Sequence, residues 1–151
     1  MRYDVSGRRL AFDTSHLIRH WHQKSGKKDA EVFSKADVEG WAGELIRLHE
    51  TRFICTVVRV EFLCNTYGGT KLQRAREFLD CFHVVDEGEL KRSDMEQAEK
   101  FAPARKNDRK PTRQLGDCLI AAVYRRLSYQ MIPAVENDLD LIRRIKPIPG
   151  E

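Results

Sequence analysis

The amino-acid sequence predicts an α/β domain in which a parallel sheet is covered by helices. Two observations predict this class. Short apolar runs alternate with segments of helical periodicity, which is the pattern of strands joined by crossover helices. Acidic residues follow several of the apolar runs, as expected where a parallel sheet binds ligands at the carboxyl ends of its strands. No repeat, linker or low-complexity segment divides the sequence, so residues 1–151 are expected to form a single domain.

The first half of the chain is expected to contain two strands, over residues 10–12 and 53–58. A helix over residues 15–23 follows the first strand. Ser-Lys-Ala-Asp at residues 34–37 is typical of a helix start and predicts a second helix. The second strand runs directly into a helix that carries Glu61.

In the second half, Thr-Lys-Leu-Gln at residues 70–73 predicts a capping box that opens a helix. Residues 83–85 predict a short strand, and Asp86 after it is expected in an exposed turn. A polar loop precedes the helix of Asp117. The chain is expected to close with a strand over residues 132–135 and a short helix.

The composition is that of a soluble globular protein. Charged residues make up 33% of the chain and hydrophobic residues 41%, which excludes the disordered and membrane-embedded classes. No apolar run approaches the roughly 20 residues of a membrane helix, and the N-terminus has no apolar segment of the signal-peptide kind. The cysteines form no CxxC pair, so no zinc or disulfide framework is indicated. We therefore expect a cytoplasmic protein with no membrane partner.

Oxygen-bearing side chains follow the predicted strands or open helices at several points. Asp13 follows the first apolar run, Glu61 follows the second, and Asp117 opens a late helix, while Asn137 and Asp140 follow the last run. Groups placed after parallel strands meet at one edge of the sheet. Carboxylates gathered there repel each other unless protons or a cation hold them together. Hard ions prefer oxygen ligands, so we expect these residues to hold one or two Mg²⁺ or Mn²⁺ ions.

Each acid also has a simpler interpretation. Asp13 could be the N-cap of the helix after the first strand, and Asp117 could stabilise the first turn of its own helix. Glu61 could pair with the nearby Arg59. The coincidence of all these acids favours a shared metal site over separate explanations.

A basic loop leads directly into the helix of Asp117. Residues 105–113 carry five cations and one acid. Cations beside a carboxylate metal site would hold the phosphate backbone of a nucleic acid. The alternative is a solvated loop, the usual role of so short a charge run. The substrate-binding candidates in this loop are Arg105, Lys106, Arg109, Lys110 and Arg113.

Three histidines in the first helix permit a second metal interpretation. His16 and His20 are four residues apart and share a helix face, and His22 is close by. This spacing would allow a zinc site. Histidines beside an apolar Trp21 are more often packed or surface residues, so zinc is not favoured.

The acidic residues, in their order, resemble the PIN-domain ribonucleases, and within them the VapC-like toxins of bacterial toxin–antitoxin modules. The resemblance rests on Asp-Thr-Ser at residues 13–15, Glu61, Gly-Asp-Cys-Leu-Ile-Ala-Ala at residues 116–122 and Asn-Asp-Leu-Asp at residues 137–140. It implies a three-layer α/β/α fold with a central, mainly parallel sheet of four to five strands. It also implies Mg²⁺- or Mn²⁺-dependent endonucleolytic cleavage of RNA, a homodimer and a cognate antitoxin protein as partner.

The resemblance assigns roles to individual residues. Asp13, Glu61 and Asp117 match the acidic triad of the family, and Asn137 and Asp140 match its more variable fourth position and the acid that follows. Thr14 and Ser15 would help to hold the metal ligands by hydrogen bonding and would contact substrate. Val135 and Leu141 depart from the family signature, which commonly has Thr and Phe there.

Other functions fit the same residues. A PIN nuclease outside the toxin group is one, and a catalytically weak RNA-binding module that uses the basic loop 105–113 is another. A helix-turn-helix DNA reader over residues 113–135 fits less well, because Gly116 and Pro133 are poorly placed for that motif.

Overall fold

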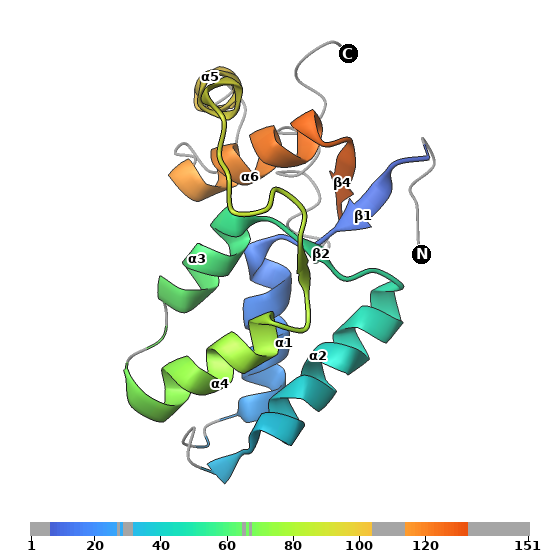
Figure 1. Cartoon of the computed structure of the whole chain (residues 1–151), viewed down its shortest axis with the longest axis vertical. Coiled ribbons are helices and arrows are strands. Elements are labelled where there is room, and N and C mark those ends of the chain that lie inside the picture. Colours follow the sequence, from blue (N-terminus) through green and yellow to red (C-terminus); the bar gives the residue numbers. More distant parts are fainter. Residues whose placement is uncertain are drawn as a thin grey trace.

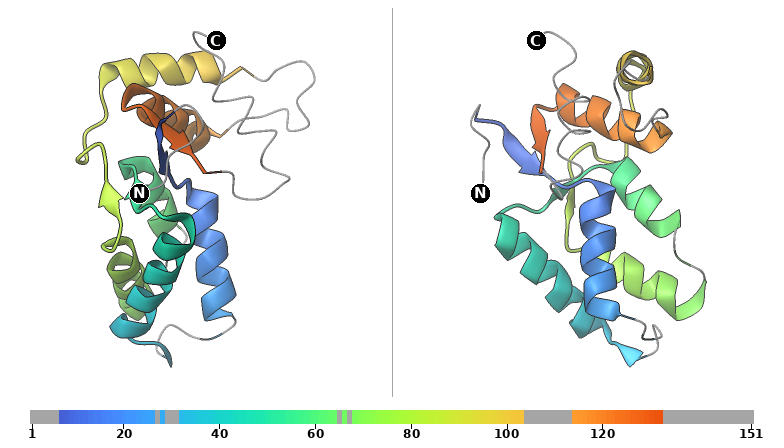
Figure 2. Two further views of the ribbon diagram at one scale, coloured as in Figure 1. Left: turned by 90° about the vertical axis from the view of Figure 1, so that its right-hand side faces the viewer. Right: turned by 180° about the vertical axis from the view of Figure 1, so that it is seen from behind.

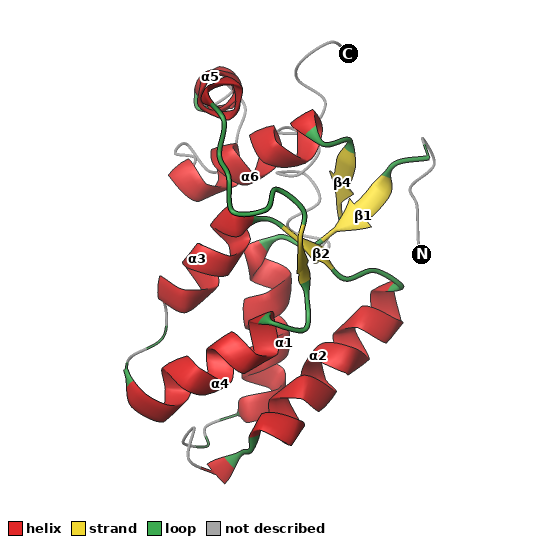
Figure 3. Cartoon of the chain, in the orientation of Figure 1, coloured by secondary structure: helices red, strands yellow, loops and turns green. Residues whose placement is uncertain are grey.

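The described part of the chain is mostly helical, with short strands between the helices (Figure 3). The structure is a computed structural model and describes residues 7–26, 28, 32–64, 66, 68–103 and 114–132. The helices are α1 (Thr14–Ser25), α2 (Lys35–His49), α3 (Thr56–Cys64), α4 (Gly69–Leu79), α5 (Arg92–Phe101) and α6 (Leu115–Arg126).

The strands pair in parallel, two by two. They are β1 (Arg9–Ala11), β2 (Phe53–Ile54), β3 (His83–Val84) and β4 (Tyr129–Met131). β1 pairs with β4, with Leu10 opposite Gln130, and β2 pairs with β3, with Phe53 opposite His83. The Phe12 N–H donates to the Phe53 carbonyl at 2.9 Å, so the end of β1 adjoins β2.

The helices lie at both ends of the molecule and the strands lie between them. α5 and α6 occupy one end of the long axis and α2 and α4 the other, in every view (Figures 1 and 2). Phe12, which follows β1, is completely buried, and the Tyr124 hydroxyl of α6 donates to its carbonyl. This hydrogen bond connects α6 to the segment that leads from β1 into α1.

The predicted α/β class and the parallel strands are confirmed. A central sheet of four to five strands is not present as one paired sheet in the described residues, where the strands form two separate pairs. The strands are only two or three residues long, so the helices supply most of the buried surface.

The second strand is shorter than predicted, because a helix begins inside the apolar run. β2 ends at Ile54 and α3 starts at Thr56. Asp86 accepts hydrogen bonds from the Thr56 N–H at 2.9 Å and from the Thr56 hydroxyl at 2.8 Å. It therefore supplies the cap that opens α3. The expectation that Asp86 lies in an exposed turn is wrong, since only 5% of it is exposed.

The last strand begins earlier than predicted. β4 covers Tyr129–Met131. It pairs in parallel with β1, with Arg9 opposite Tyr129 and Ala11 opposite Met131. Of the predicted strand over residues 132–135, only Ile132 is described, and its N–H donates to the Ala11 carbonyl at 2.9 Å. The predicted short terminal helix lies outside the described residues.

One predicted helix start is confirmed and another is wrong. Ser34 accepts from the Asp37 N–H at 3.1 Å, and Asp37 accepts from the Ser34 N–H at 2.8 Å, which completes a capping box. α4 instead begins at Gly69, and its N-cap Gly68 has φ 26° and no side-chain cap. Glycine tolerates this positive φ, so Gly68 can form the turn from which α4 begins.

A buried ion pair joins α5 to α6. Asp94 is 1% exposed and accepts from Arg126 Nε at 2.7 Å and from Nη2 at 3.0 Å. Asp94 also accepts from the Lys91 N–H at 2.9 Å and so caps α5. Arg126 is therefore a structural partner of Asp94 rather than part of an open basic surface.

None of the helices in the described ranges has the length and apolar character needed to cross a bilayer.

Candidate functional site

Asp13 lies where β1 passes into α1, and it serves as the N-cap of that helix. Its backbone is extended, with φ −96° and ψ 175°. Its Oδ1 accepts from the His16 N–H at 3.2 Å and from the Ser15 hydroxyl at 2.7 Å. The cap interpretation of Asp13 is confirmed. These bonds use one carboxylate oxygen, and they hold the half-buried side chain in a defined orientation.

Glu61 reaches from α3 to the first residue of α1. The Thr14 hydroxyl, on a residue only 9% exposed, donates to Glu61 Oε1 at 2.6 Å. Arg59 pairs with Asp80 at 2.9 Å, so the alternative in which Arg59 neutralises Glu61 is wrong. The two residues joined by this bond are 47 positions apart in the sequence.

Glu61 also lies against the first turn of α6, which carries Asp117. A Cβ atom built on Gly116 would lie 1.9 Å from Glu61 Oε2. The carboxylate therefore occupies the space that a side chain at position 116 would need. Asp117, the next residue, is half-buried in the same helical turn.

The electrostatics of Glu61 show that the other two predicted acids, Asp117 and Asp13, act on it. Burial raises the pKa of Glu61 above its ordinary value. The hydrogen bond from Thr14 opposes this rise, while the negative charges of Asp117 and Asp13 add to it. A carboxylate in this position is stabilised by added positive charge, which a divalent cation would supply.

The donor set suits a hard cation that keeps much of its water. In the described ranges, no three His, Cys, Asp or Glu side chains are grouped closely enough to hold one ion by themselves. Mg²⁺ is usually bound through one or two carboxylates, with waters and substrate phosphates completing its shell. Asp13, Glu61 and Asp117 carry the oxygen donors that such an ion would take.

Several predicted site residues lie outside the described residues. These are the two expected ligands after the last apolar run and the cations of the basic loop, namely Asn137, Asp140, Arg105, Lys106, Arg109, Lys110 and Arg113.

Two histidines of α1 lie within hydrogen-bonding distance of backbone carbonyls outside this helix. His16 is 6% exposed, and its Nε2 lies 3.0 Å from the Ile132 carbonyl oxygen. His20 Nε2 lies 2.8 Å from the Trp41 carbonyl oxygen, and His22 is exposed. The packed interpretation is confirmed for His16, and the structure gives no support to a zinc site on this helix.

An open hollow on α1 begins at Ser15, next to the acids. It is lined by Ser15, Ile18, Arg19, His22 and Gln23. Arg19, which was not among the predicted site residues, adds a cation to this hollow. Its position could be inferred from the sequence, because Arg19 follows Ser15 by four residues and so shares its helix face.

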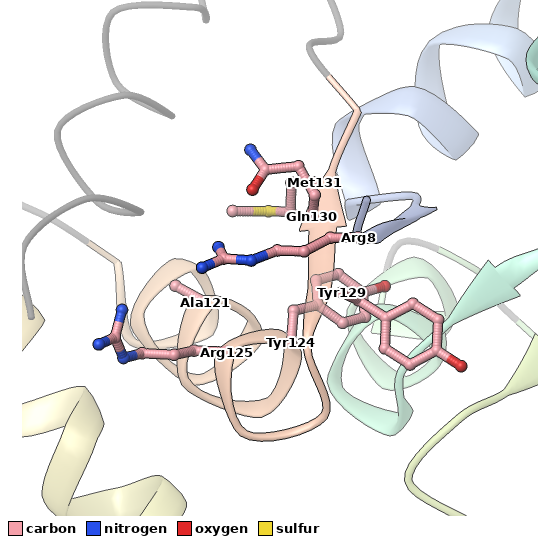
Figure 4. A pocket seen from close by; sticks show the side chains of 7 residues that line it. All are labelled: Arg8, Ala121, Tyr124, Arg125, Tyr129, Gln130 and Met131. Atoms are coloured by element: carbon pink, nitrogen blue, oxygen red, sulfur yellow. The ribbon is translucent and has the colours of Figure 1, made fainter. Parts of the chain in front are cut away.

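A second hollow carries two arginines beside β4. Arg8 and Arg125 extend to the same side of β4 as the Gln130 amide (Figure 4). Tyr124 and Tyr129 also line it. Arg125 adds a cation to this face of the protein, whereas Tyr124 is 2% exposed and belongs to the core.

The fold and this site together define a mixed α/β protein in which acids from the β1–α1 junction, α3 and α6 adjoin. Comparisons with family models, with curated proteins and with solved structures give no match to this chain.

Proposed function

We propose that this protein is a Mg²⁺- or Mn²⁺-dependent endoribonuclease that hydrolyses RNA phosphodiester bonds. The observation that carries the proposal is the convergence of Asp13, Glu61 and Asp117. Glu61 binds Thr14 beside Asp13, packs against Gly116 beside Asp117, and has its pKa raised by both acids. Carboxylates kept together in this way are the usual protein ligands of a phosphodiester-cleaving ion.

The finer fold that we propose is a PIN-like, three-layer α/β/α arrangement. The bond from Phe12 to Phe53 supports a single sheet with the strand order β3–β2–β1–β4. In that sheet the carboxyl ends of all strands lie at one edge, which is the ligand-binding edge of parallel sheets.

In the proposed mechanism, Asp13, Glu61 and Asp117 hold the ion together with Asn137 and Asp140. An ion held there would supply Lewis-acid chemistry, lowering the pKa of a water and stabilising negative charge on the phosphate. Thr14 keeps Glu61 Oε1 oriented, and Ser15 does the same for Asp13 Oδ1. The cations of the loop 105–113, which lies outside the described residues, would bind the RNA backbone beside the metal site. We further propose that the protein is the toxin of a toxin–antitoxin pair, acts as a homodimer, and is covered by its antitoxin.

Asp117→Asn is expected to abolish metal-dependent cleavage and leave the fold intact, because asparagine retains the shape of the side chain but loses the charge. The assay is cleavage of a mixed cellular RNA pool with Mg²⁺ or Mn²⁺. Discrete cuts are expected from the unaltered protein, and they should vanish with a chelator and in the variant. Glu99→Gln, at an exposed acid of α5, is the matched control and should cut normally. Undiminished cutting by Asp117→Asn would remove Asp117 from the site.

Thr14→Val is expected to weaken Mn²⁺ binding by about 10- to 100-fold, the usual cost of losing a group that orients a ligand. Valine keeps the shape of threonine but cannot donate to Glu61 Oε1. Thr51→Val is the control, because it also removes a buried hydroxyl, which donates to the Leu10 carbonyl at 2.7 Å. Calorimetric titration should show an unchanged affinity in Thr51→Val. Equal affinities in both variants would contradict a role for Thr14 at the site.

The second candidate function is RNA binding without efficient cleavage. The observation that favours it is the pair of arginines in the hollow beside β4 (Figure 4). Guanidinium groups bind phosphate oxygens regardless of a metal. RNA retention that falls steeply with salt, ignores chelator and is lost in Arg8→Gln with Arg125→Gln would favour this function.

A further inference from the structure

We infer that Gly116 is a positioning residue of the metal site, because the missing side chain at this position makes the room in which the Glu61 carboxylate lies. This inference rests on the proposed function, and it explains why the first turn of α6 contains a glycine.

The backbone does not require glycine at position 116. α6 runs from Leu115 to Arg126, so Gly116 is its second residue. The glycines with positive φ are elsewhere in the described chain, at Gly7, Gly26, Gly68, Gly69 and Gly88. A glycine inside a helix costs stability relative to alanine. The local backbone gives no reason for glycine at position 116. We therefore look for the reason in the group that approaches it.

The group that approaches Gly116 is the carboxylate of Glu61. A Cβ atom at position 116 would lie 1.9 Å from Glu61 Oε2, 2.5 Å from Cδ and 3.0 Å from Oε1. Gly40, in the interior of α2, would meet nothing within 4 Å. Gly40 and Gly116 both lie in helices and neither has a positive φ, but only Gly116 is approached by a carboxylate.

Alanine at position 116 can be accommodated only if Glu61 moves. The carboxylate is the end of a flexible side chain, so the helix can keep its place and the side chain can turn away. That movement breaks the 2.6 Å hydrogen bond from Thr14 to Oε1. It also separates the Glu61 oxygens from the turn that carries Asp117. The fold is retained while the arrangement of the acids is lost.

The test compares Gly116→Ala with Gly40→Ala in the full-length protein. Both variants should fold and melt at or above the temperature of the unaltered protein, because alanine favours a helix. Mn²⁺ binding, measured by calorimetric titration, should weaken at least about ten-fold in Gly116→Ala, as for loss of an orienting contact. It should be unchanged in Gly40→Ala. An unaltered affinity in Gly116→Ala would overturn the inference.

A rescue variant separates a positioning role from a general effect on folding. Glu61→Asp shortens the side chain by one methylene, which makes room for a Cβ atom at position 116. Gly116→Ala combined with Glu61→Asp should therefore bind Mn²⁺ more tightly than the product of the two single losses implies. Strictly additive losses would count against the inference.

One further measurement distinguishes failure of the inference from failure of the proposed function. If the unaltered protein binds no Mn²⁺ and cuts no RNA, the proposed function fails. The position of Glu61 is then read from the ¹³C chemical shift of its carboxyl carbon, which needs no metal. A change in this shift in Gly116→Ala and not in Gly40→Ala supports control of Glu61 by Gly116. An unchanged shift in both variants overturns it.

Discussion

Replacing Arg126 with methionine is expected to lower the free energy of unfolding by about 3–5 kcal/mol, the usual cost of leaving a buried charge without its partner. Asp94 is 1% exposed and accepts two hydrogen bonds from Arg126, so the substitution leaves a buried carboxylate whose remaining hydrogen bond, within the described residues, comes from the Lys91 N–H. Since the pair joins α5 to α6, the helix that carries Asp117, its loss should also loosen the candidate site. Chemical denaturation followed by circular dichroism measures the change.

Arg92→Met is the matched control for Arg126→Met. Arg92 pairs with Glu96 at 3.4 Å, but the two side chains are 94% and 63% exposed. Exposed pairs contribute about 0–1 kcal/mol, so this variant should unfold almost normally. Adding Asp94→Asn to Arg126→Met should recover part of the loss, because asparagine removes the buried charge and still accepts from the Lys91 N–H. Equal destabilisation by Arg92→Met and Arg126→Met would contradict this account.

Glu61→Gln is expected to reduce metal-dependent cleavage by at least about 100-fold, beyond the loss typical of an orienting group. The same substitution is expected to stabilise the protein near pH 7. Glutamine keeps an oxygen that accepts from Thr14, but it does not repel Asp13 and Asp117. A change that improves stability and removes activity is typical of a site where charges are held together for function. Mg²⁺ should raise the melting temperature of the unaltered protein and not that of the variant.

The pH dependence of this stability difference follows from the direction of the shift. Burial, aided by Asp117 and Asp13, raises the pKa of Glu61 in the folded state above 4.5. The folded state therefore binds this proton more tightly than the unfolded state does, and the contribution of Glu61 to stability is lost as the pH rises through the folded-state pKa. Glu61→Gln and the unaltered protein should differ little well below pH 4.5. The advantage of the variant should grow above that pH and then level off.

Glu44→Gln provides a control of opposite sign. The hydrogen bond from Lys24 lowers the pKa of Glu44, which lies on the surface of α2. Loss of that charge should slightly destabilise the protein near pH 7, where Glu61→Gln stabilises it. Melting temperatures recorded from pH 4 to pH 8 test both directions. A melting temperature of Glu61→Gln below that of the unaltered protein at pH 7 would contradict the proposed electrostatics.

The parts of the site that could be predicted from the sequence are those that depend on near neighbours. Asp13 follows the first strand and caps α1, and Asp117 lies in the first turn of α6. The capping box at Ser34 was also predictable. Asp13 and Ser34 act on backbone groups three positions away, and Asp117 needs only its place in the first helical turn, so the local pattern contains the whole feature.

The contacts that could not be predicted join residues far apart in the sequence. The Thr14–Glu61 bond spans 47 positions, the Asp86–Thr56 cap spans 30, and the Asp94–Arg126 pair spans 32. An apolar pattern predicts whether a residue is buried, but it does not predict which distant residue contacts it. For this reason the run over residues 53–58 predicted one strand, whereas the Asp86 cap opens a helix within it at Thr56.

The sequence by itself determined the α/β class of the fold, the order of most of its elements and the placement of acids after strands or in first helical turns. Only the tertiary structure decided that Glu61 lies between Thr14 and Gly116, and that Arg126 belongs to Asp94. The physical reason is that local propensities act over one or two helical turns. The position of a carboxylate relative to its neighbours is instead set by the packing of α1, α3, α5 and α6 around the short strands.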